Sequence, residues 1–210
     1  AILFALPFGL SVAIYMSEVA NSRVRNLLKP IIELLSGIPS VVYGFLGLIV
    51  IVPFLQQVFD LPVGESGLAG SIVLAIMALP TIITVTEDAM RNCPRAMREA
   101  SLALGASQWQ TIYKVVIPYS ISGITSGVVL GIGRAVGETM AVLMVTGNAA
   151  VIPHTILEPL RTIPATIAAE LGEAPAGGPH YEALFLLGVV LFFISLLINF
   201  TVEAVSPRRK

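Results

Sequence analysis

Five long stretches of the sequence contain no charged residue. Each complete stretch reaches the roughly 20 residues that a helix needs to cross about 30 Å of hydrocarbon. None has the polar face that a buried helix of a soluble protein keeps, and charged residues make up only 12% of the chain. The sequence therefore predicts an all-α fold, a polytopic bundle of transmembrane helices. The predicted spans are residues 1–17, 34–59, 66–86, 115–133 with a continuation to about 147, and 183–202.

The lysines and arginines are concentrated in alternate connections between these spans. Of the 12 basic residues, 10 lie in connections 21–33 and 87–114 and in the tail, which ends in Arg208, Arg209 and Lys210. Connections rich in basic residues stay on the cytoplasmic side of a membrane. We therefore expect a multi-pass protein of the cytoplasmic (inner) membrane, embedded in lipid. Connection 87–118 and the C-terminus are expected inside, and the N-terminus outside.

The chain starts within an apolar run that has no initiator methionine and no preceding basic segment. We therefore expect residues 1–210 to form one transmembrane domain that is truncated at its N-terminus. Connection 87–118 is expected to be a structured cytoplasmic loop within this domain.

Connection 87–118 carries signals for two short helices. Pro94 can open a helix, and Gly105 can end it, because glycine closes helices in the left-handed conformation. Ser107 can cap a second helix, which Pro118 is expected to separate from the next span. Apolar side chains on both helices, with a polar rim, would form a surface suited to docking onto another protein. The apolar side chains are Met97, Leu102, Leu104 and Trp109.

Gly123, Gly127 and Gly131 recur at four-residue spacing in the fourth predicted span. Small residues at this spacing let two helices approach closely. We expect this face to pack within the subunit, with a seam between subunits as the alternative. In the outer connection 148–182, Pro164 and Gly172 predict the beginning and end of a further short helix.

Motifs for catalysis and metal binding are absent from the sequence. No lysine follows a glycine, so there is no G-x-x-x-x-G-K-[ST] loop to bind ATP. The single Cys93 makes a metal site improbable, and His154 and His180 stand isolated in the outer connection. We expect no catalytic residue, no cofactor and no nucleic-acid partner. Energy for any active transport would enter through a partner subunit.

Connection 87–118 resembles the coupling motif of ABC importer permeases. This motif reads E-A-A, three residues, G, nine residues, I-x-L-P. The spacing is matched throughout, and the departures are conservative in size. Ser101 stands for alanine, Val115 for isoleucine and Ile117 for leucine. The matching residues are Glu99, Ala100, Ser101, Gly105, Val115, Ile117 and Pro118.

This resemblance implies the permease core typical of such importers, called MetI-like. It implies a helix pair that sits in a cleft of an ABC ATPase subunit and transmits its closure to the pore. It also implies two further partners, a second permease subunit and an extracytoplasmic binding protein. A secondary transporter or channel is the alternative from another class, but it would not need an ATPase-docking loop. A purely structural membrane scaffold is a third possibility, but it would leave Arg134 and Glu138 unexplained.

Arg134 and Glu138 lie inside the continuation of the fourth predicted span. A charge at the membrane centre costs roughly 2.5–3.5 kcal/mol on insertion scales, and such residues face a pathway or pair together. Four-residue spacing would place both on one helix face. Two interpretations remain open: a structural ion pair, or a substrate pathway in which Arg134 meets an anion and Glu138 holds or competes for it.

Further stretches resemble the permeases of phosphate importers, and more the "C" partner of the permease pair than the "A" partner. An intramembrane Arg and Glu in that family correspond to Arg134 and Glu138. The resemblance implies phosphate as substrate and a phosphate-binding protein as partner, with molybdate, tungstate or sulfate as alternatives. The resembling stretches are residues 38–44, 79–81, 134–148, 167–173 and 179–181.

Overall fold

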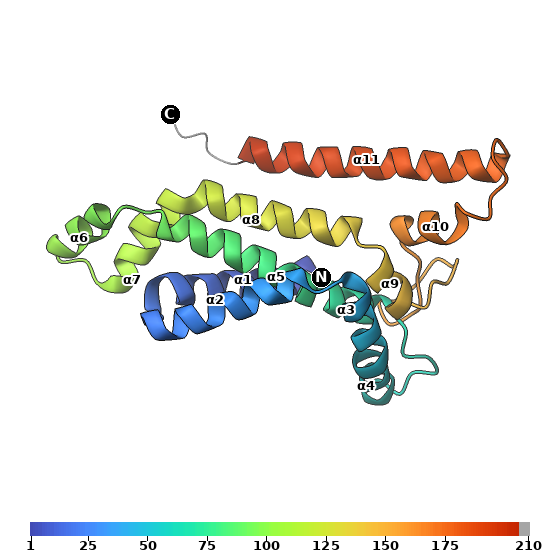
Figure 1. Cartoon of the computed structure of the whole chain (residues 1–210), viewed down its shortest axis with the longest axis horizontal. Helices are drawn as coiled ribbons and strands as arrows, with labels where there is room; N and C mark the ends of the chain where they lie inside the picture. The colour runs from blue at the N-terminus through green and yellow to red at the C-terminus, as the bar shows by residue number, and fades with distance from the viewer. Residues whose placement is uncertain (206–210) are drawn as a thin grey trace. The chain divides into compact units, whose positions relative to one another are not determined.

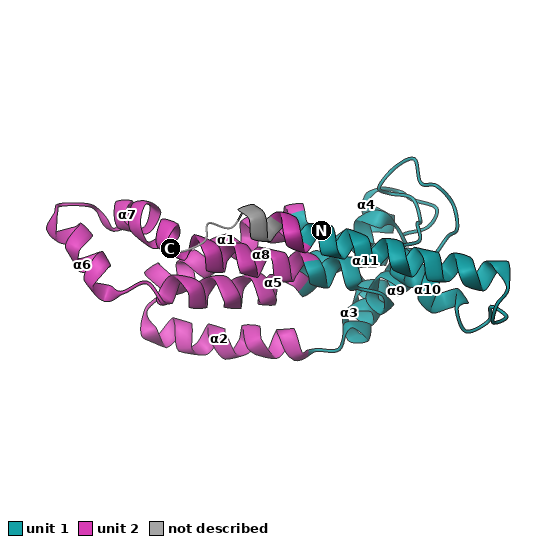
Figure 2. Cartoon of the chain, turned by 90° about the horizontal axis from the view of Figure 1, so that it is seen from above, with its two compact units in different colours: residues 1–2, 38–77, 133–198 teal, residues 3–37, 78–132, 199–210 magenta. Residues whose placement is uncertain are grey.

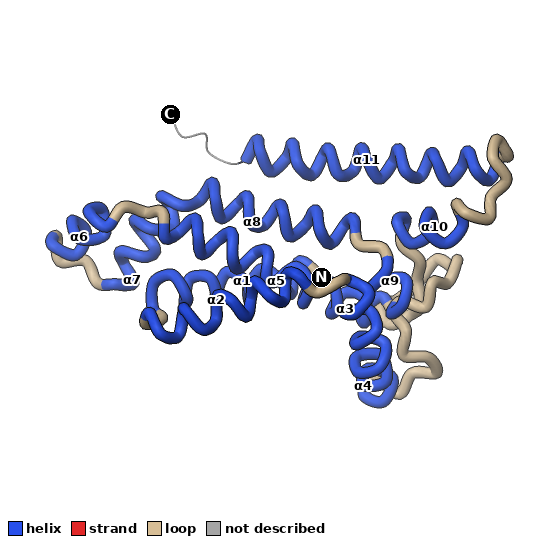
Figure 3. The backbone as a smooth tube through the Cα atoms, in the orientation of Figure 1, coloured by secondary structure: helices blue, strands red, loops and turns tan. Residues whose placement is uncertain are grey.

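The computed structural model describes residues 1–205, and the basic tail at Arg208, Arg209 and Lys210 lies outside them. No strand occurs in residues 1–205 (Figure 3), and the predicted all-α fold is confirmed. The helices and π-helical turns (η) are α1 (Ile2–Ile14), η1 (Tyr15–Val19), α2 (Ser22–Gly37), α3 (Ser40–Leu46), η2 (Gly47–Ile51), α4 (Val52–Val58), α5 (Gly67–Arg91), α6 (Arg95–Ala103), α7 (Gln108–Thr111), η3 (Ile112–Val116), α8 (Ile117–Gly137), α9 (Met140–Val145), α10 (Ile163–Glu170) and α11 (Pro179–Val205) (Figure 1).

Five helical segments of the described chain are long and apolar enough to cross a membrane, as predicted. They cover Ile2–Val19, Ser40–Val58, Gly67–Arg91, Gln108–Gly137 and Pro179–Thr201.

The second span is shorter than predicted because the chain leaves the helical conformation before it. Residues 34–37 belong to α2, a separate helix, and Pro39 has an extended backbone with φ −57° and ψ 139°. Proline also pushes the preceding residue, here Ile38, away from the helical region. The span therefore begins at Ser40 and not at Leu34.

The prediction that Pro118 separates two helices is wrong. Residues 108–137 form one continuous helical segment, which passes through the π-helical turn η3. In this turn the N–H of Ile117 donates to the carbonyl of Ile112, five residues back. The hydrogen-bond ladder is already shifted at this point, so the missing N–H of Pro118 does not end the helix.

The continuation of the fourth span to Gly147 is also corrected. The helix ends at Gly137, residues 138 and 139 are not helical, and α9 begins at Met140. The Glu138 carboxylate accepts the N–H of Ala141 at 3.2 Å. It thus satisfies a donor that the start of a helix leaves unpaired.

The chain divides into two compact units (Figure 2). One unit contains residues 3–37 and 78–132 and the described residues from 199 onward, and the other contains residues 1–2, 38–77 and 133–198.

In the unit that contains α6 and α7, the glycines of α8 pack against α5. A Cβ added at Gly123 would lie 2.3 Å from the Cβ of Ala89, and one at Gly127 would lie 3.0 Å from Thr86 Oγ1. The approach at Gly123 leaves no room for a side chain, and the approach at Gly127 leaves room only if Thr86 shifts slightly. The predicted close contact within the subunit is confirmed. Gly131 continues the row against Ile82.

The same unit joins α1 and α2 as neighbouring helices. Leu28 and Ile32 of α2 pack against Ala13 and Met16 at the end of the first span and against Ile83 of α5. This apolar face holds α2 along the membrane helices.

The other unit has its own core around α9. Gly44 lies so close to α9 that a Cβ there would be 2.8 Å from the Cα of Ala141. The predicted short helix in connection 148–182 is confirmed as α10, capped by the Thr162 hydroxyl, which accepts the N–H of Ala165. The buried cluster consists of Tyr43, Val52, Leu55, Ala69, Val73, Met77, Ala141 and Val145.

Candidate functional site

The connection between the third and fourth spans folds into the two predicted helices, α6 and α7. Pro94 precedes α6, and Gly105 follows its last turn with a φ of +84°. The N–H of Gly105 donates to the Leu102 carbonyl at 2.9 Å, and the N–H of Ala106 donates to the Ser101 carbonyl at 3.2 Å. This Schellman arrangement requires a left-handed residue at Gly105. The glycine-terminated helix is therefore confirmed.

Ser107 begins the second helix through a reciprocal cap. Its hydroxyl accepts the N–H of Gln110 at 3.3 Å, and the Gln110 side chain accepts the Ser107 N–H at 2.8 Å. Both bonds satisfy donors that a helix start leaves unpaired. Together with Gly105, this cap sets a sharp bend between α6 and α7. Residues 94–113 are called the elbow below.

The elbow carries an open apolar surface. Leu104 is 90% exposed, and Trp109 and Tyr113 are exposed as well. Glu99 and Ala100 of the predicted coupling motif are also exposed on α6. The predicted docking residues are therefore accessible to another protein.

The remaining residues of the motif lie at the base of the fourth span. Val115 and Ile117 are half-buried, whereas Pro118 is exposed. These residues connect the elbow to the span and do not extend its open apolar surface. Ile117 packs against a buried cluster formed by Met90, Cys93, Ile112 and Val116.

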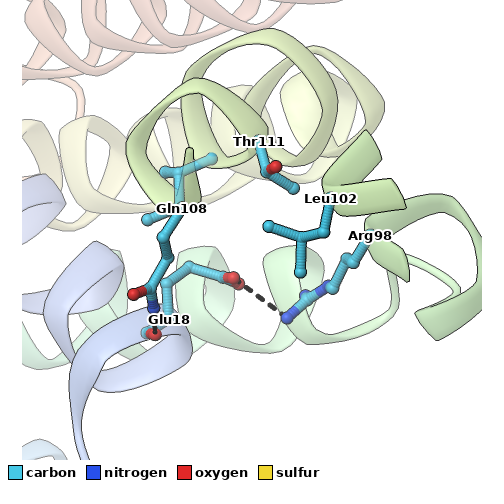
Figure 4. A pocket seen from close by; sticks show the side chains of 6 residues that line it. Glu18, Arg98, Leu102, Gln108 and Thr111 are labelled. Carbon is cyan, nitrogen blue, oxygen red and sulfur yellow. Dashed lines mark hydrogen bonds and ion pairs between the residues drawn. The ribbon is translucent and has the colours of Figure 1, made fainter. Parts of the chain in front are cut away.

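An ion pair joins α6 to the end of the first span. Arg98 Nη1 donates to Glu18 Oε2 at 2.9 Å, and Arg98 Nη2 donates to the Met90 carbonyl at 2.8 Å. The Glu18 side chain is only 7% exposed, and its backbone carbonyl accepts Gln108 Nε2 at 3.0 Å. Figure 4 shows these side chains around a cavity of about 330 Å³. This ion pair was not predicted from the sequence, because no local signal links two residues 80 positions apart.

A second polar contact joins α6 to α7 within the elbow. The hydroxyls of Ser101 and Thr111 lie 2.9 Å apart and share a hydrogen bond. Ser101 is the residue at which the sequence departs from the alanine of the coupling motif. Alanine could not form this bond, so the departure adds a link between α6 and α7.

A cluster of charges joins α2 to α5. Lys29 Nζ lies 2.7 Å from Glu87 Oε2 and also pairs with Asp88. Arg91 lies 3.5 Å from the other Glu87 oxygen. Burial lowers the pKa of Lys29, but hydrogen bonds to Asp88 and Glu87 outweigh this effect and raise the pKa above its usual value. Sequence reasoning missed this cluster because its partners lie on separate helices.

The structure changes the relation between Arg134 and Glu138. Both side chains are half-buried, but Arg134 lies in α8, and Glu138 follows the end of that helix. The two residues therefore do not share a continuous helix face, because α8 stops at Gly137. A glycine followed by Glu138 and Thr139 is the sequence signal of a helix end and a new cap.

His180, which looks isolated in the sequence, has a partner in connection 148–182. Its Nε2 lies 3.1 Å from Glu170 Oε2, and Arg161 pairs with the other Glu170 oxygen. Arg161 Nε also donates to the Asn148 carbonyl at 3.0 Å. These contacts tie α10 to the first turn of α11 and to the segment that follows α9.

Residues 5–210 match the family described as the binding-protein-dependent transport system inner membrane component. The chain belongs to this family. The match covers the spans, the elbow and the residues around the break at Glu138. The five apolar helices and the exposed loop between the third and fourth of them agree with a permease of this family.

Several curated relatives of this permease are similar over nearly the whole chain. The probable ABC transporter permease protein YqgH of Bacillus subtilis is 44% identical over 99% of this chain and 67% of its own length. The phosphate transport system permease protein PstC of Mesorhizobium japonicum is 39% identical over 94% of this chain and 66% of its own length. PstC 1 of Mycobacterium tuberculosis is 36% identical over 99% of this chain. The chain thus spans about two thirds of the length of these relatives.

Solved structures support the MetI-like permease fold. A chain of the inward-facing MetNI methionine ABC transporter matches with a TM-score of 0.75 at 20% identity, over 98% of this permease and 87% of that chain. A chain of a bacterial ABC transporter for alginate import matches with a TM-score of 0.67 at 19% identity, over 98% of this permease and 74% of that chain. At these identities the likeness shows the fold.

Proposed function

We propose that this permease is the membrane-spanning subunit of an ATP-driven importer that moves inorganic phosphate into the cell. The observation that carries the proposal is the elbow between the third and fourth spans. Leu104, Trp109 and Tyr113 leave an apolar surface open at its tip, and hydrogen bonds from Arg98 and Gln108 fix its base to the first and third spans. A surface of this kind is suited to a partner protein.

The partner proposed for the elbow is an ABC ATPase subunit on the cytoplasmic side. The spacing of the coupling motif from Glu99 to Pro118 supports this assignment, and the exposed Glu99 and Ala100 are available for the contact. The partner subunit would then hydrolyse ATP, and its conformational change would displace the elbow. A secondary transporter would have no use for such a surface.

Orientation follows from the same proposal. The elbow and the C-terminus would lie in the cytoplasm, as the bias of basic residues indicates. Helix α10 and its contacts with Arg161 and His180 would then lie on the outer side, where a phosphate-binding protein would deliver its ligand. A second permease subunit would complete the pathway.

Phosphate is proposed over other oxyanions because several relatives named PstC are similar along 94–99% of the chain. Arg134 is the residue proposed to meet the anion, since a guanidinium can bind an oxyanion through two parallel hydrogen bonds. Glu138 is proposed to shape the pathway by capping α9 at the break. Molybdate, tungstate or sulfate would be the substrate if selectivity lies elsewhere.

Co-purification tests the docking proposal. Leu104→Glu places a charge on the apolar tip and should abolish co-purification of the ATPase subunit from detergent-solubilised membranes. Leu104 is almost fully exposed, so folding should not change. Ile152→Glu is the matched control, because Ile152 is 87% exposed in the outer connection. Retention of the ATPase by Leu104→Glu would contradict the proposed docking surface.

A further inference from the structure

The half-buried residues of helix α6 are polar, and both of them bind other elements of the same unit. None of its residues from Arg95 to Ala103, all of which the structure describes, is fully buried. The two half-buried residues are Arg98 and Ser101. They lie three positions apart and therefore on one face of the helix.

These two residues make different connections. Ser101 binds Thr111 of α7, so it links the two halves of the elbow. Arg98 reaches further, because its guanidinium binds both Glu18 at the end of the first span and the Met90 carbonyl near the end of the third. Arg98 therefore contacts two membrane spans, the first and the third.

The surroundings of Arg98 reinforce this point. A cavity of about 330 Å³ lies next to the pair, lined also by Leu102, Gln108, Thr111 and Ile112. Movement passes readily between elements that are close-packed, because protein interiors are nearly incompressible. At this cavity the packing of α6 is incomplete, and the hydrogen bonds of Arg98 and Ser101 bridge from α6 to the neighbouring elements.

Hydrogen bonds fix the position of Glu18, so a movement of Arg98 would be passed on to the first span. The Ser17 hydroxyl donates to Glu18 Oε1 at 2.7 Å, while Oε2 accepts from Arg98. Gln108 of α7 binds the Glu18 backbone carbonyl. The residue lies in the π-helical turn η1, and such turns are frequent at functional sites.

We propose that the Arg98–Glu18 pair transmits the displacement of the elbow to the first membrane span, with Arg98 as a positioning residue for transport. This inference rests on the proposed ATP-driven import and adds the contact through which α6 acts. The planar guanidinium of Arg98 donates to Glu18 through Nη1 and to the Met90 carbonyl through Nη2, so two acceptors on different spans fix its position. The pair therefore resists movement of α6 both toward and away from the first span.

The test uses the complete importer, reconstituted with its ATPase subunits, second permease and binding protein. Arg98→Gln removes the charge, and we expect stimulation of ATP hydrolysis by phosphate-loaded binding protein to fall by about fivefold or more, within the usual range of coupling between distant sites. Phosphate uptake should fall with it, while hydrolysis without binding protein persists. Arg98→Lys keeps the charge but loses the fork, and should retain intermediate stimulation. Arg23→Gln, at an exposed arginine of α2, is the control and should behave as the unmodified complex.

A double variant separates transmission from stability. Removing Arg98 alone leaves the Glu18 carboxylate buried without a cation, which can prevent assembly, whereas apolar replacement of a whole buried pair is often neutral. Glu18→Leu/Arg98→Met should therefore assemble and still lack stimulation. Normal stimulation in this double variant, or in Arg98→Gln, would overturn the proposal. Failure of the unmodified complex to import phosphate would instead refute the proposed function.

Discussion

The ammonium of Lys29 lies 2.7 Å from a carboxylate oxygen of Glu87 and so joins α2 to α5. The Glu87 side chain is 1% exposed, and it depends on Lys29 because Arg91 stands 3.5 Å away. A charge that is this deeply buried needs a cation nearby.

Lys29→Met should therefore destabilise the protein. Breaking a buried pair costs about 3–5 kcal/mol, and the partial exposure of Lys29 places the expected loss at the lower end. Thermal unfolding of the purified protein in detergent measures the effect. Lys29→Met/Glu87→Met should recover most of the lost stability, and equal destabilisation in both variants would contradict the buried pair.

The Lys29 contact also predicts a pH dependence. Because the pKa of Lys29 is raised in the folded protein, its contribution is complete below the ordinary lysine pKa and is lost as the pH rises through the higher folded value. The stability difference between the unmodified protein and Lys29→Met should stay constant from about pH 6 to pH 8, well below the lysine pKa. It should shrink only in strongly alkaline solution. A difference that already disappears near neutral pH would show that the pair is not formed.

Position 123 has no room for a side chain, whereas position 133 has room for one. A Cβ at Gly123 would meet the Cβ of Ala89 at 2.3 Å, whereas nothing lies within 4 Å of a Cβ at Gly133. Gly123→Ala should cost about 1–3 kcal/mol through overpacking, since Ala89 has no flexible side chain to move. Gly133→Ala should be neutral or slightly stabilising, because alanine favours helices. Similar melting temperatures for both variants would contradict the close contact of α8 with α5.

The bend of the elbow should depend on the left-handed conformation of Gly105. Gly105→Val forces a β-branched side chain into this conformation, at a cost of roughly 1–2 kcal/mol or more. We expect transport to fall and ATP hydrolysis to lose its dependence on binding protein, although the subunit still inserts. Gly105→Asn is the matched control, because asparagine tolerates positive φ values. Full transport by Gly105→Val would show that the bend is not needed.

Much of this architecture could be predicted from the sequence because it follows from local chemistry. Uncharged length predicted the five spans, and Pro94, Gly105 and Ser107 predicted the elbow, since each acts within one helical turn. The effect of Pro118 was misjudged because its missing N–H coincides with a π-helical turn, which depends on the neighbouring residues. The break at Glu138 was missed because the apolar residues on both sides suggest one span.

The ionic contacts could not be predicted in the same way. Arg98 and Glu18 lie 80 positions apart, and Lys29 and Glu87 lie 58 positions apart. No periodicity connects residues on separate helices, so their pairing appears only once the helices are packed. The number of basic residues in each loop predicted the orientation in the membrane, but it could not predict which charged residues form ion pairs.

Orientation can be tested by thiol labelling of whole cells. Cys93 is buried, so its lack of reaction would not report the side of the membrane. Exposed positions are needed, and Glu173→Cys and Arg95→Cys provide them. A membrane-impermeant reagent should label Glu173→Cys only, and should label Arg95→Cys once the membrane is permeabilised. The reverse pattern would overturn the proposed orientation.

Arg134 provides the most specific test of the substrate pathway. Arg134→Gln should abolish phosphate uptake in an assembled complex, because the neutral amide cannot replace the guanidinium toward an oxyanion. Glu138→Gln should assemble normally, since its amide oxygen can still accept the N–H of Ala141 that caps α9. Normal uptake by Arg134→Gln would remove this residue from the proposed pathway.

The central claim, ATP-driven import of phosphate, is tested most directly by uptake of radiolabelled phosphate into proteoliposomes. The vesicles contain this permease with its second permease and ATPase subunits, with binding protein supplied on the outer side. We predict uptake that requires ATP hydrolysis and is not reduced by equal concentrations of sulfate, molybdate or tungstate. Uptake without ATP, or transport of another of these oxyanions in preference to phosphate, would contradict the account.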